Sequence, residues 1–163
     1  MIIAICGFMG AGKTSFLKMY PDVSSVDLDK FMEEELGSEL GSYIRENGWK
    51  AFRDFESKSL IKALDSLGNT GLLSLGGGTL DSSENREALV QKGVKVLHLE
   101  VSFEEAMQRI KGDSNRPQLD KSPKELKELY LERDKVFMEA KQCSLPSDSS
   151  VWPTNWTVLK SLF

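Results

Sequence analysis

Residues 7–14 read GFMGAGKT, and this stretch from Gly7 to Thr14 decides the fold. Two glycines separated by four residues, then Lys13 and Thr14, follow the apolar run 2–6, which predicts a buried strand. In such a loop the backbone N–H groups surround a phosphate, the lysine reaches the outer phosphates, and the threonine hydroxyl is a ligand for Mg²⁺. The stretch therefore predicts nucleotide binding; the alternative is an ordinary glycine-rich turn between a strand and a helix.

Length and composition limit the class of protein. The chain has 163 residues, 40% of them hydrophobic and 28% charged, which fits one compact domain over residues 1–163. The net charge of −4 and the pI near 5.2 argue against a nucleic-acid partner, because phosphate-backbone binding needs clustered Lys and Arg.

The cysteines, the N-terminal run and the single histidine point to ordinary core positions. Cys6 and Cys143 have no metal-ligand spacing, and we expect buried free thiols of a cytoplasmic protein. The apolar start has no basic region before it and is interrupted by Lys13, so neither a signal peptide nor a membrane span is predicted. His98 falls in the apolar run 94–99 and is predicted to be a strand residue rather than a catalyst.

Apolar runs alternate with helical patterns along the whole chain. The expected strands are 2–6, 23–27, 71–75, 94–99 and 143–146, and the expected helices are 29–35, 40–66, 83–91, 102–110 and 122–141. This alternation predicts an α/β fold, a parallel sheet covered by helices on both faces. The polar stretch 111–117, broken by Gly and Pro, is either a mobile flap or a plain surface loop.

Two carboxylates end the second expected strand. Asp27 and Asp29 are two residues apart, so in a strand both side chains would face one site at the carboxyl edge of the sheet. One could hold Mg²⁺ through water while the other accepts the proton of an attacking hydroxyl. The alternative is that Asp29 caps the next helix.

Arg53 and Glu56 lie three residues apart on one helical face. They form either an exposed ion pair or an arginine that its glutamate holds in place to bind a substrate carboxylate. Gly76, Gly77 and Gly78 follow the strand that ends near Ser74, and they let a ligand approach the bare backbone. Ser74 itself could orient a water on the metal.

Three further arginines can serve a phosphoryl-transfer site or lie on the surface. Arg116 precedes Pro117 in the broken stretch, where it could neutralise charge that develops on the transferring group. Arg109 lies on the other side of the same stretch, and Arg133 lies in a highly charged helical pattern that usually indicates a solvated face.

Taken in order, these motifs resemble the shikimate kinase family over almost the whole chain. The order is the phosphate loop, Asp-x-Asp, Phe-Arg-x-x-Glu, Gly-Gly-Gly, Arg-Pro and a late helical Arg. The resemblance implies a three-layer α/β/α P-loop kinase architecture with a five-stranded parallel sheet, an acceptor-binding segment near 29–57 and a mobile lid near 109–121. It also implies transfer of the γ-phosphoryl group of MgATP to the 3-hydroxyl of shikimate, a step towards aromatic amino acids, by a monomer.

The resemblance assigns a role to each motif residue. The implied catalytic residues are Lys13, Asp29 and Arg116, and Mg²⁺ would be held by Thr14 and, through water, by Asp27. The residues that would contact ATP are Gly10, Ala11, Gly12, Lys13, Thr14, Ser15, Arg109 and Arg116. The residues that would contact shikimate are Asp29, Arg53, Gly76, Gly77, Gly78 and Arg133.

The chain departs from the family pattern at a few positions. Trp49 stands where the family often has an acid before Phe-Arg, Phe137 stands where Tyr is common, and no basic residue precedes Pro153 in the expected adenine loop. Two other functions stay open: a kinase for another small hydroxylated acid such as gluconate, and a catalytically silent homologue that binds nucleotide or a partner protein.

Overall fold

Five parallel strands form one sheet in the order β2-β3-β1-β4-β5 in the computed structural model, which describes residues 1–112 and 117–163. The strands are β1 (Ile2–Cys6), β2 (Ser25–Asp27), β3 (Gly71–Ser74), β4 (Lys95–Glu100) and β5 (Cys143–Pro146). The central strands are almost continuously apolar because both of their faces are buried, as expected for a parallel sheet.

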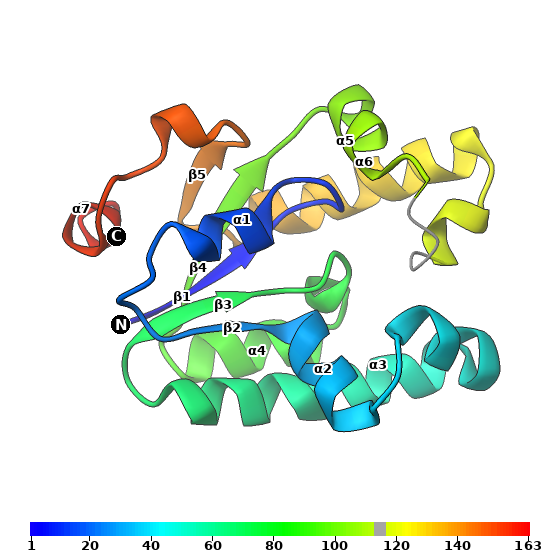
Figure 1. Ribbon diagram of the computed structural model, residues 1–163, viewed down its shortest axis with the longest axis horizontal. Coiled ribbons are helices and arrows are strands. Elements are labelled where there is room, and N and C mark those ends of the chain that lie inside the picture. Colours follow the sequence, from blue (N-terminus) through cyan, green and yellow to red (C-terminus); the bar gives the residue numbers. More distant parts are fainter. Residues whose placement is uncertain (113–116) are drawn as a thin grey trace.

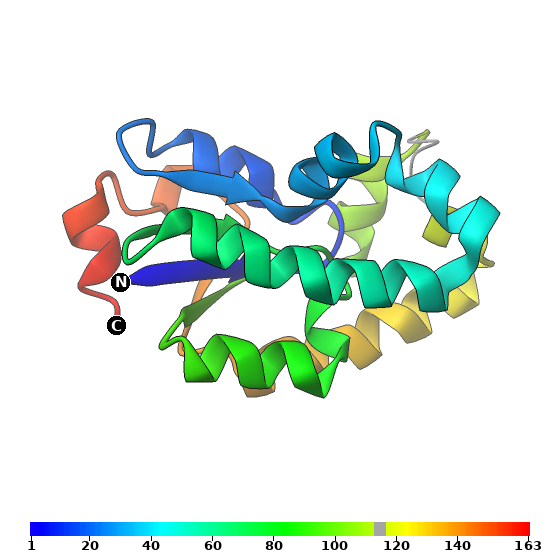
Figure 2. The ribbon, with the colours of Figure 1, turned by 90° about the horizontal axis from the view of Figure 1, so that it is seen from below.

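Helices cover both faces of this sheet (Figure 1). They are α1 (Lys13–Lys18), α2 (Leu28–Leu36), α3 (Leu40–Leu67), α4 (Ser83–Gln91), α5 (Phe103–Ile110), α6 (Pro123–Ala140) and α7 (Trp156–Lys160), with short 3₁₀ turns η1 (Thr79–Asp81), η2 (Pro117–Asp120) and η3 (Ser149–Val151). Figure 2 shows α1 on one side of the sheet and α4 on the other, and in this view α3 runs between them. The predicted three-layer α/β/α fold with five parallel strands is therefore confirmed.

Three local expectations need correction. The helix predicted over 40–66 is interrupted at Gly48, whose φ of 84° and ψ of 167° are not helical. The strand predicted over 23–27 is only the three residues of β2. Cys143 is half-buried rather than buried, because β5 is an edge strand, whereas Cys6 in β1 is fully buried.

The carboxyl ends of the strands converge on one edge of the sheet, where the loops after them meet. The phosphate loop follows β1, α2 follows β2 directly, and the glycines 76–78 come shortly after β3. The pairing of Ile5 with Ser74 and of Ser74 with Asp27 fixes the relative heights of these three loops. In an open α/β sheet this edge is where ligands bind.

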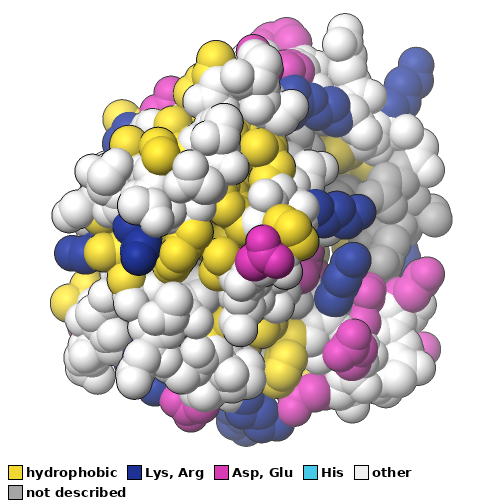
Figure 3. Space-filling view, turned by 60° about the vertical axis from the view of Figure 1, so that its left-hand side comes forward, with side chains coloured by type: hydrophobic (Ala, Val, Ile, Leu, Met, Phe, Trp, Pro, Cys, Tyr) yellow, Lys and Arg dark blue, Asp and Glu magenta, His cyan; other side chains and the backbone are white. Residues whose placement is uncertain are grey.

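Neither the helices in the described part of the chain nor the face in Figure 3 shows a long, uniformly apolar stretch. None of the helices in the described part of the chain has the length and the apolar composition needed to cross a membrane. On the face that Figure 3 shows, basic and acidic side chains are interspersed, with apolar side chains exposed between them.

Candidate active site

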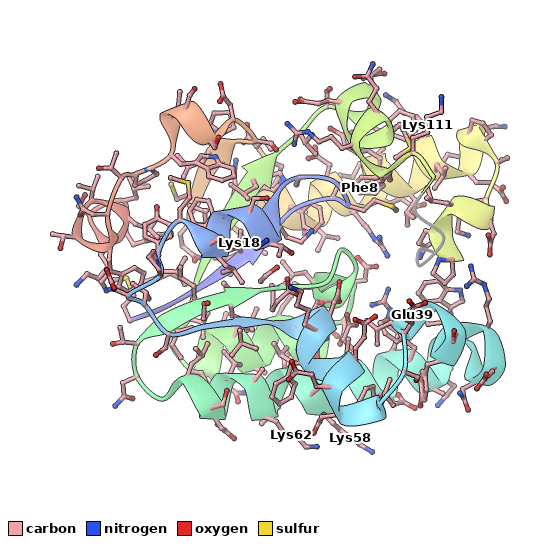
Figure 4. All side chains as sticks on the ribbon, viewed as in Figure 1. Phe8, Lys18, Glu39, Lys58, Lys62 and Lys111 are labelled. Atoms are coloured by element: carbon pink, nitrogen blue, oxygen red, sulfur yellow. The ribbon has the colours of Figure 1, made fainter. Side chains whose placement is uncertain are left out.

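Glycines shape the phosphate loop, because its backbone conformation and the atoms close to it leave little room for larger side chains. Gly10 and Gly12 have φ of 81° and 91°, a left-handed conformation that side chains rarely adopt. A Cβ on Gly10 would lie only 3.0 Å from the Ala106 carbonyl oxygen of α5. Phe8, labelled in Figure 4, packs edge-on against Tyr130 of α6 at 5.2 Å between ring centroids, so the loop is fixed from two sides.

Lys13 lies across the mouth of this loop. Its Nζ donates hydrogen bonds to the carbonyl oxygens of Gly7, at 2.8 Å, and of Phe8, at 3.3 Å. The ammonium group is therefore held where the loop opens, as a point charge that outer phosphates of a nucleotide can meet.

Thr14 and Asp27 are joined by a direct hydrogen bond. The Thr14 hydroxyl donates to Asp27 Oδ2 at 2.6 Å, and both residues line a cavity of about 260 Å³ together with Gly12 and Lys13. Asp27 is the N-cap residue of α2, yet its side chain makes no capping bond and turns to Thr14 instead.

Asp29 reaches the same cavity by a different route from the expected one. The prediction placed Asp27 and Asp29 on one face of a strand, but Asp29 lies in the first turn of α2 because β2 ends at Asp27. It does not cap that helix, since Asp27 occupies the N-cap position. Both carboxylates nevertheless line the cavity at the phosphate loop.

Arg109 connects the phosphate loop to the segment after β5. The Arg109 guanidinium donates hydrogen bonds to the Gly10 carbonyl oxygen, at 2.9 Å, and to both the carbonyl and the hydroxyl oxygens of Ser147. The Ser147 hydroxyl in turn donates to the Ala11 carbonyl oxygen at 2.5 Å. Trp152 is buried and packs against Phe16 of α1 at 4.9 Å between ring centroids. The tryptophan thus has a packing role beneath the loop.

Arg53 is held by a buried carboxylate. Its Nη1 donates to Glu56 Oε2 at 2.5 Å, and the Thr79 hydroxyl donates to the other carboxylate oxygen, Oε1, at 2.8 Å. Glu56 is only 1% exposed and Arg53 28% exposed, so the pair is not the exposed ion pair that was the alternative reading of this motif.

Arg133 is buried as well, although its helix carries many charges. It is 4% exposed, and its Nε lies 3.4 Å from Asp81 Oδ2. Burial lowers the pKa of Arg133 below its ordinary value; Asp81 opposes this shift, and the neighbouring Arg53 adds to it. Two cations therefore face one another across the same small space.

The three glycines make room for these two guanidiniums. A Cβ on Gly78 would lie 2.3 Å from Arg53 Nη2 and 2.4 Å from Arg133 Nη2, and a Cβ on Gly77 would lie 3.3 Å from Arg133 Nη1. A Cβ on Gly76 would meet Glu56 at 2.9 Å and Asp29 at 3.0 Å. None of these three glycines has a positive φ, so no special backbone conformation requires them. They are needed because they have no side chain.

The same pocket has an aromatic wall from α3. Trp49 and Phe52 meet edge-on at 5.8 Å between ring centroids, and the Arg53 guanidinium carbon lies 5.5 Å from the Trp49 ring and 5.1 Å from the Phe52 ring. Both distances are within the range of a cation–π interaction. Trp49, which replaces an acid of the family pattern, thus packs against the arginine.

Asp29 connects the two halves of the site. It lines the cavity at the phosphate loop and also the pocket that contains Arg53, Arg133 and the glycines. An anion-binding loop and an arginine pocket therefore share one carboxylate at their boundary, which is the arrangement that transfer of a group between two bound molecules requires.

Some partners in the site were not predicted from the sequence. Asp81 and Ser147 have no motif spacing, and the pocket also contains Met9, Pro117 and Gln118. Arg116 was predicted to be catalytic and lies outside the described residues.

The fold and this site define a kinase of the P-loop class that acts on a small molecule. The shikimate kinase family model matches residues 9–153, so the chain belongs to the shikimate kinase family. A shikimate kinase of Persephonella marina is 36% identical over 141 residues, which are 85% of this chain and 84% of that protein. The pentafunctional AROM polypeptide of Candida tropicalis is 33% identical over 83% of this chain, a segment that is 9% of the polypeptide.

A solved structure supports the same family. The shikimate kinase from Acinetobacter baumannii, in complex with shikimate, superposes with a TM-score of 0.83 at 26% identity over 99% of this chain and 90% of that one. The predicted family and activity class are confirmed: the chain is a kinase whose co-substrate is ATP. The roles of individual residues stay predictions.

Proposed function

We propose that this chain transfers the γ-phosphoryl group of ATP to the 3-hydroxyl of shikimate and that Asp29 is the base of this reaction. The observation that carries the proposal is the position of Asp29 at the boundary of the phosphate-loop cavity and the arginine pocket. A carboxylate at that boundary can touch the acceptor hydroxyl and still lie close to the phosphate that the hydroxyl attacks.

The donor side consists of the phosphate loop, Lys13 and Thr14. Backbone N–H groups of residues 10–15 bind the phosphates, and the Lys13 ammonium offsets charge on the transferring group. Thr14 and Asp27 fit Mg²⁺ as a hydroxyl ligand and a carboxylate that binds through water, because Mg²⁺ usually keeps waters and takes substrate phosphates as ligands. Bound there, the metal supplies positive charge to the phosphates. The described residues hold no cluster of three or more His, Cys, Asp or Glu that would form an all-protein cage.

The acceptor side consists of two arginines over bare backbone. Arg53 and Arg133 converge at Gly78, and a carboxylate between them would relieve the repulsion between the partly buried Arg53 and the buried Arg133. Shikimate is a small carboxylic acid with several ring hydroxyls, so its carboxylate fits the arginines and its hydroxyls fit Asp29 and the glycine backbone.

In the reaction, the Asp29 carboxylate accepts the proton of the 3-hydroxyl while that oxygen bonds to the γ-phosphorus. The bond between this phosphorus and the β–γ bridging oxygen breaks, and ADP leaves with the electron pair. In this proposal Arg109 contacts the adenine and Arg116 neutralises charge on the transferring group, the roles that the family resemblance implies for them. The acceptor segment 29–57, the lid 109–121, a monomeric state and a cytoplasmic location are part of the same proposal; Cys6 and Cys143, both free thiols, suit a reducing compartment.

A coupled assay of ADP release tests the substrate. The purified protein with MgATP is given shikimate, gluconate or no acceptor, and we expect only shikimate to raise ADP release above the rate without acceptor. Stimulation by gluconate alone would favour the other small-acid kinase, and no stimulation by either would favour a silent homologue.

Replacement of Arg53 tests the acceptor pocket. Arg53→Ala leaves one carboxylate oxygen of the substrate unpaired and Glu56 without its cation, so KM for shikimate should rise about 10- to 100-fold, the effect of losing a charge-assisted hydrogen bond. The matched control is Lys50→Ala, which removes an exposed cation of the same helix that pairs only with Asp54 among the ion pairs described. Normal shikimate affinity in Arg53→Ala would refute the pocket assignment.

A further inference from the structure

The short turn η1 carries side chains that support both arginines of the acceptor pocket. The Thr79 hydroxyl donates to Glu56 Oε1 at 2.8 Å, and Glu56 Oε2 accepts from Arg53. Two residues further on, the Asp81 carboxylate accepts from Arg133 Nε at 3.4 Å. One turn of three residues therefore contributes to the orientation of two guanidiniums that come from different helices, α3 and α6.

Thr79 binds the oxygen of Glu56 that the arginine does not engage. A carboxylate that is bound through one oxygen can still rotate about its terminal torsion, which has a broad energy profile. A hydrogen bond to the other oxygen restricts that rotation, and it is strong here because Thr79 and Glu56 are both buried away from water. The Thr79 hydroxyl thus sets the plane in which Glu56 meets Arg53.

Asn85 anchors η1 to the first turn of α4. Its Nδ2 donates to the Thr79 carbonyl oxygen at 2.8 Å, and both residues are buried. A buried carbonyl group that loses its donor is costly, so this bond holds the turn in place. The start of α4 is itself fixed, because the Ser82 hydroxyl caps the helix by accepting from the Asn85 N–H at 3.3 Å.

Backbone hydrogen bonds join η1 to the glycine run. The Thr79 N–H donates to the Gly76 carbonyl oxygen at 3.2 Å, and the Asp81 N–H donates to the Gly78 carbonyl oxygen at 3.0 Å. A shift of η1 would therefore move the bare backbone that faces the two guanidiniums together with the groups that orient them.

We propose that Thr79 and Asn85 are positioning residues of the acceptor pocket. Asn85 fixes η1 through the Thr79 carbonyl group, and the Thr79 hydroxyl orients Glu56 beneath Arg53. Neither Thr79 nor Asn85 lines the pocket, so both act through other residues. Thr79 acts through Arg53 alone, whereas Asn85, by holding the whole turn, acts through Arg53 and Arg133. The inference rests on the proposed function, in which these two arginines bind the carboxylate of shikimate.

Steady-state kinetics of Thr79→Val and Thr79→Ser test the role of the hydroxyl. Valine keeps the shape of threonine and loses the hydroxyl, whereas serine keeps the hydroxyl and loses a methyl group. We expect KM for shikimate to rise about 3- to 10-fold in Thr79→Val, the effect of one hydrogen bond, and to stay within about twofold of the wild type in Thr79→Ser. A residue that only fills space would give the opposite order, since serine leaves a cavity. That order, or a wild-type KM in Thr79→Val, would overturn the inference.

Double-mutant cycles with Arg53→Ala separate the two routes. In the Arg53→Ala background, Thr79→Val should raise KM for shikimate no further, because its effect passes through the arginine that has been removed. Asn85→Ala should still raise KM in that background, at least about twofold, because η1 also carries the partner of Arg133. Full additivity of Thr79→Val with Arg53→Ala, or a wild-type KM in Asn85→Ala, would contradict the proposal.

Asn155→Ala is the matched control for Asn85→Ala. It removes the side-chain cap of α7 and so lowers stability without touching η1, and KM for shikimate and for ATP should both stay at the wild-type values. Unchanged KM for ATP in the Thr79 and Asn85 variants shows that they are folded. A wild-type chain without shikimate-dependent ADP release would overturn the proposed function and this inference together, whereas an active wild type with unaffected variants overturns the inference alone.

Discussion

Replacing Gly78 by alanine adds one methyl group at the point where the two arginines of the acceptor pocket converge. The φ of Gly78 is −119°, so alanine fits the backbone without strain. The new Cβ would lie 2.3 Å from Arg53 Nη2 and 2.4 Å from Arg133 Nη2, about 1 Å inside ordinary contact, so both guanidiniums must move. Neither moves freely, because Glu56 and Asp81 hold them.

The size of the effect follows from what the arginines do. A misplacement of about 1 Å in a positioning group can cost about 100-fold in catalysis, and a lost charge-assisted hydrogen bond costs about 1.5–3 kcal/mol. We therefore expect Gly78→Ala to raise KM for shikimate about 10- to 100-fold while KM for ATP stays within about twofold. The free energy of unfolding should also fall, by about 1–3 kcal/mol, because the added methyl group overpacks a site whose two guanidiniums are held by carboxylates.

Gly93→Ala is the crossed control in the same ADP-release and urea-unfolding assays. Gly93 has a φ of +64° and no atom within 4 Å of an added Cβ, so alanine there should cost about 1 kcal/mol of stability and leave both KM values unchanged. If Gly78→Ala bound shikimate with wild-type affinity, the argument that this glycine positions the two guanidiniums would be refuted. Loss of stability without loss of affinity would refute it equally.

Three further predictions concern the donor side and the core. Lys13→Ala should lower kcat by at least about 100-fold, because the phosphoryl group loses its cation, while calorimetry should show that shikimate binding is retained. The control is Lys18→Ala, at an exposed position of the same helix, which should keep the wild-type kcat. Equal kcat values in the two variants would contradict the assignment. Burial lowers the pKa of His98 below its ordinary 6.5, against the opposing effects of Asp134 and Glu100. As pH falls through 6.5, His98 becomes protonated in the unfolded chain but stays neutral in the folded chain, so the free energy of unfolding measured with urea should decrease towards pH 5. This group contributes at most about 1.4 kcal/mol per pH unit. In His98→Leu that part of the decrease should be absent. Burial raises the pKa of Cys6 to about 12, so a thiol reagent at pH 8 should modify the half-buried Cys143 slowly and reach Cys6 only after denaturant is added, as peptide mass spectrometry would show; rapid labelling of Cys6 in the folded protein would contradict this.

The sheet was predictable because its strands are buried on both faces. Such strands are continuous apolar runs, so β1, β3, β4 and β5 were located to within about one residue, and their alternation with helical patterns implied parallel connections. The kink at Gly48 was not predictable in the same way. A glycine inside a helical pattern is usually tolerated, and only its φ of 84° shows that the helix breaks there.

Within the candidate site, the sequence predicted the residues that belong to motifs and missed the residues that support them. Asp27 and Asp29 reach one cavity, but from a strand end and a helix turn rather than from one strand face, because β2 is too short to contain both. Asp81 pairs with Arg133 across 52 positions of sequence, and Gln118 enters the pocket from η2. Contacts of that kind depend on how the elements pack, and no local pattern encodes them.

The pairing of each arginine with its own acid explains how an acidic chain can hold an anionic substrate. Glu56 and Asp81 stabilise a partly buried and a buried cation, and each acid engages one edge of its guanidinium. The Nη2 atoms of Arg53 and Arg133 are left facing the bare backbone at Gly78. Removing either acid should therefore weaken shikimate binding even though neither acid contacts the substrate, since the arginine that it orients would no longer be held at Gly78.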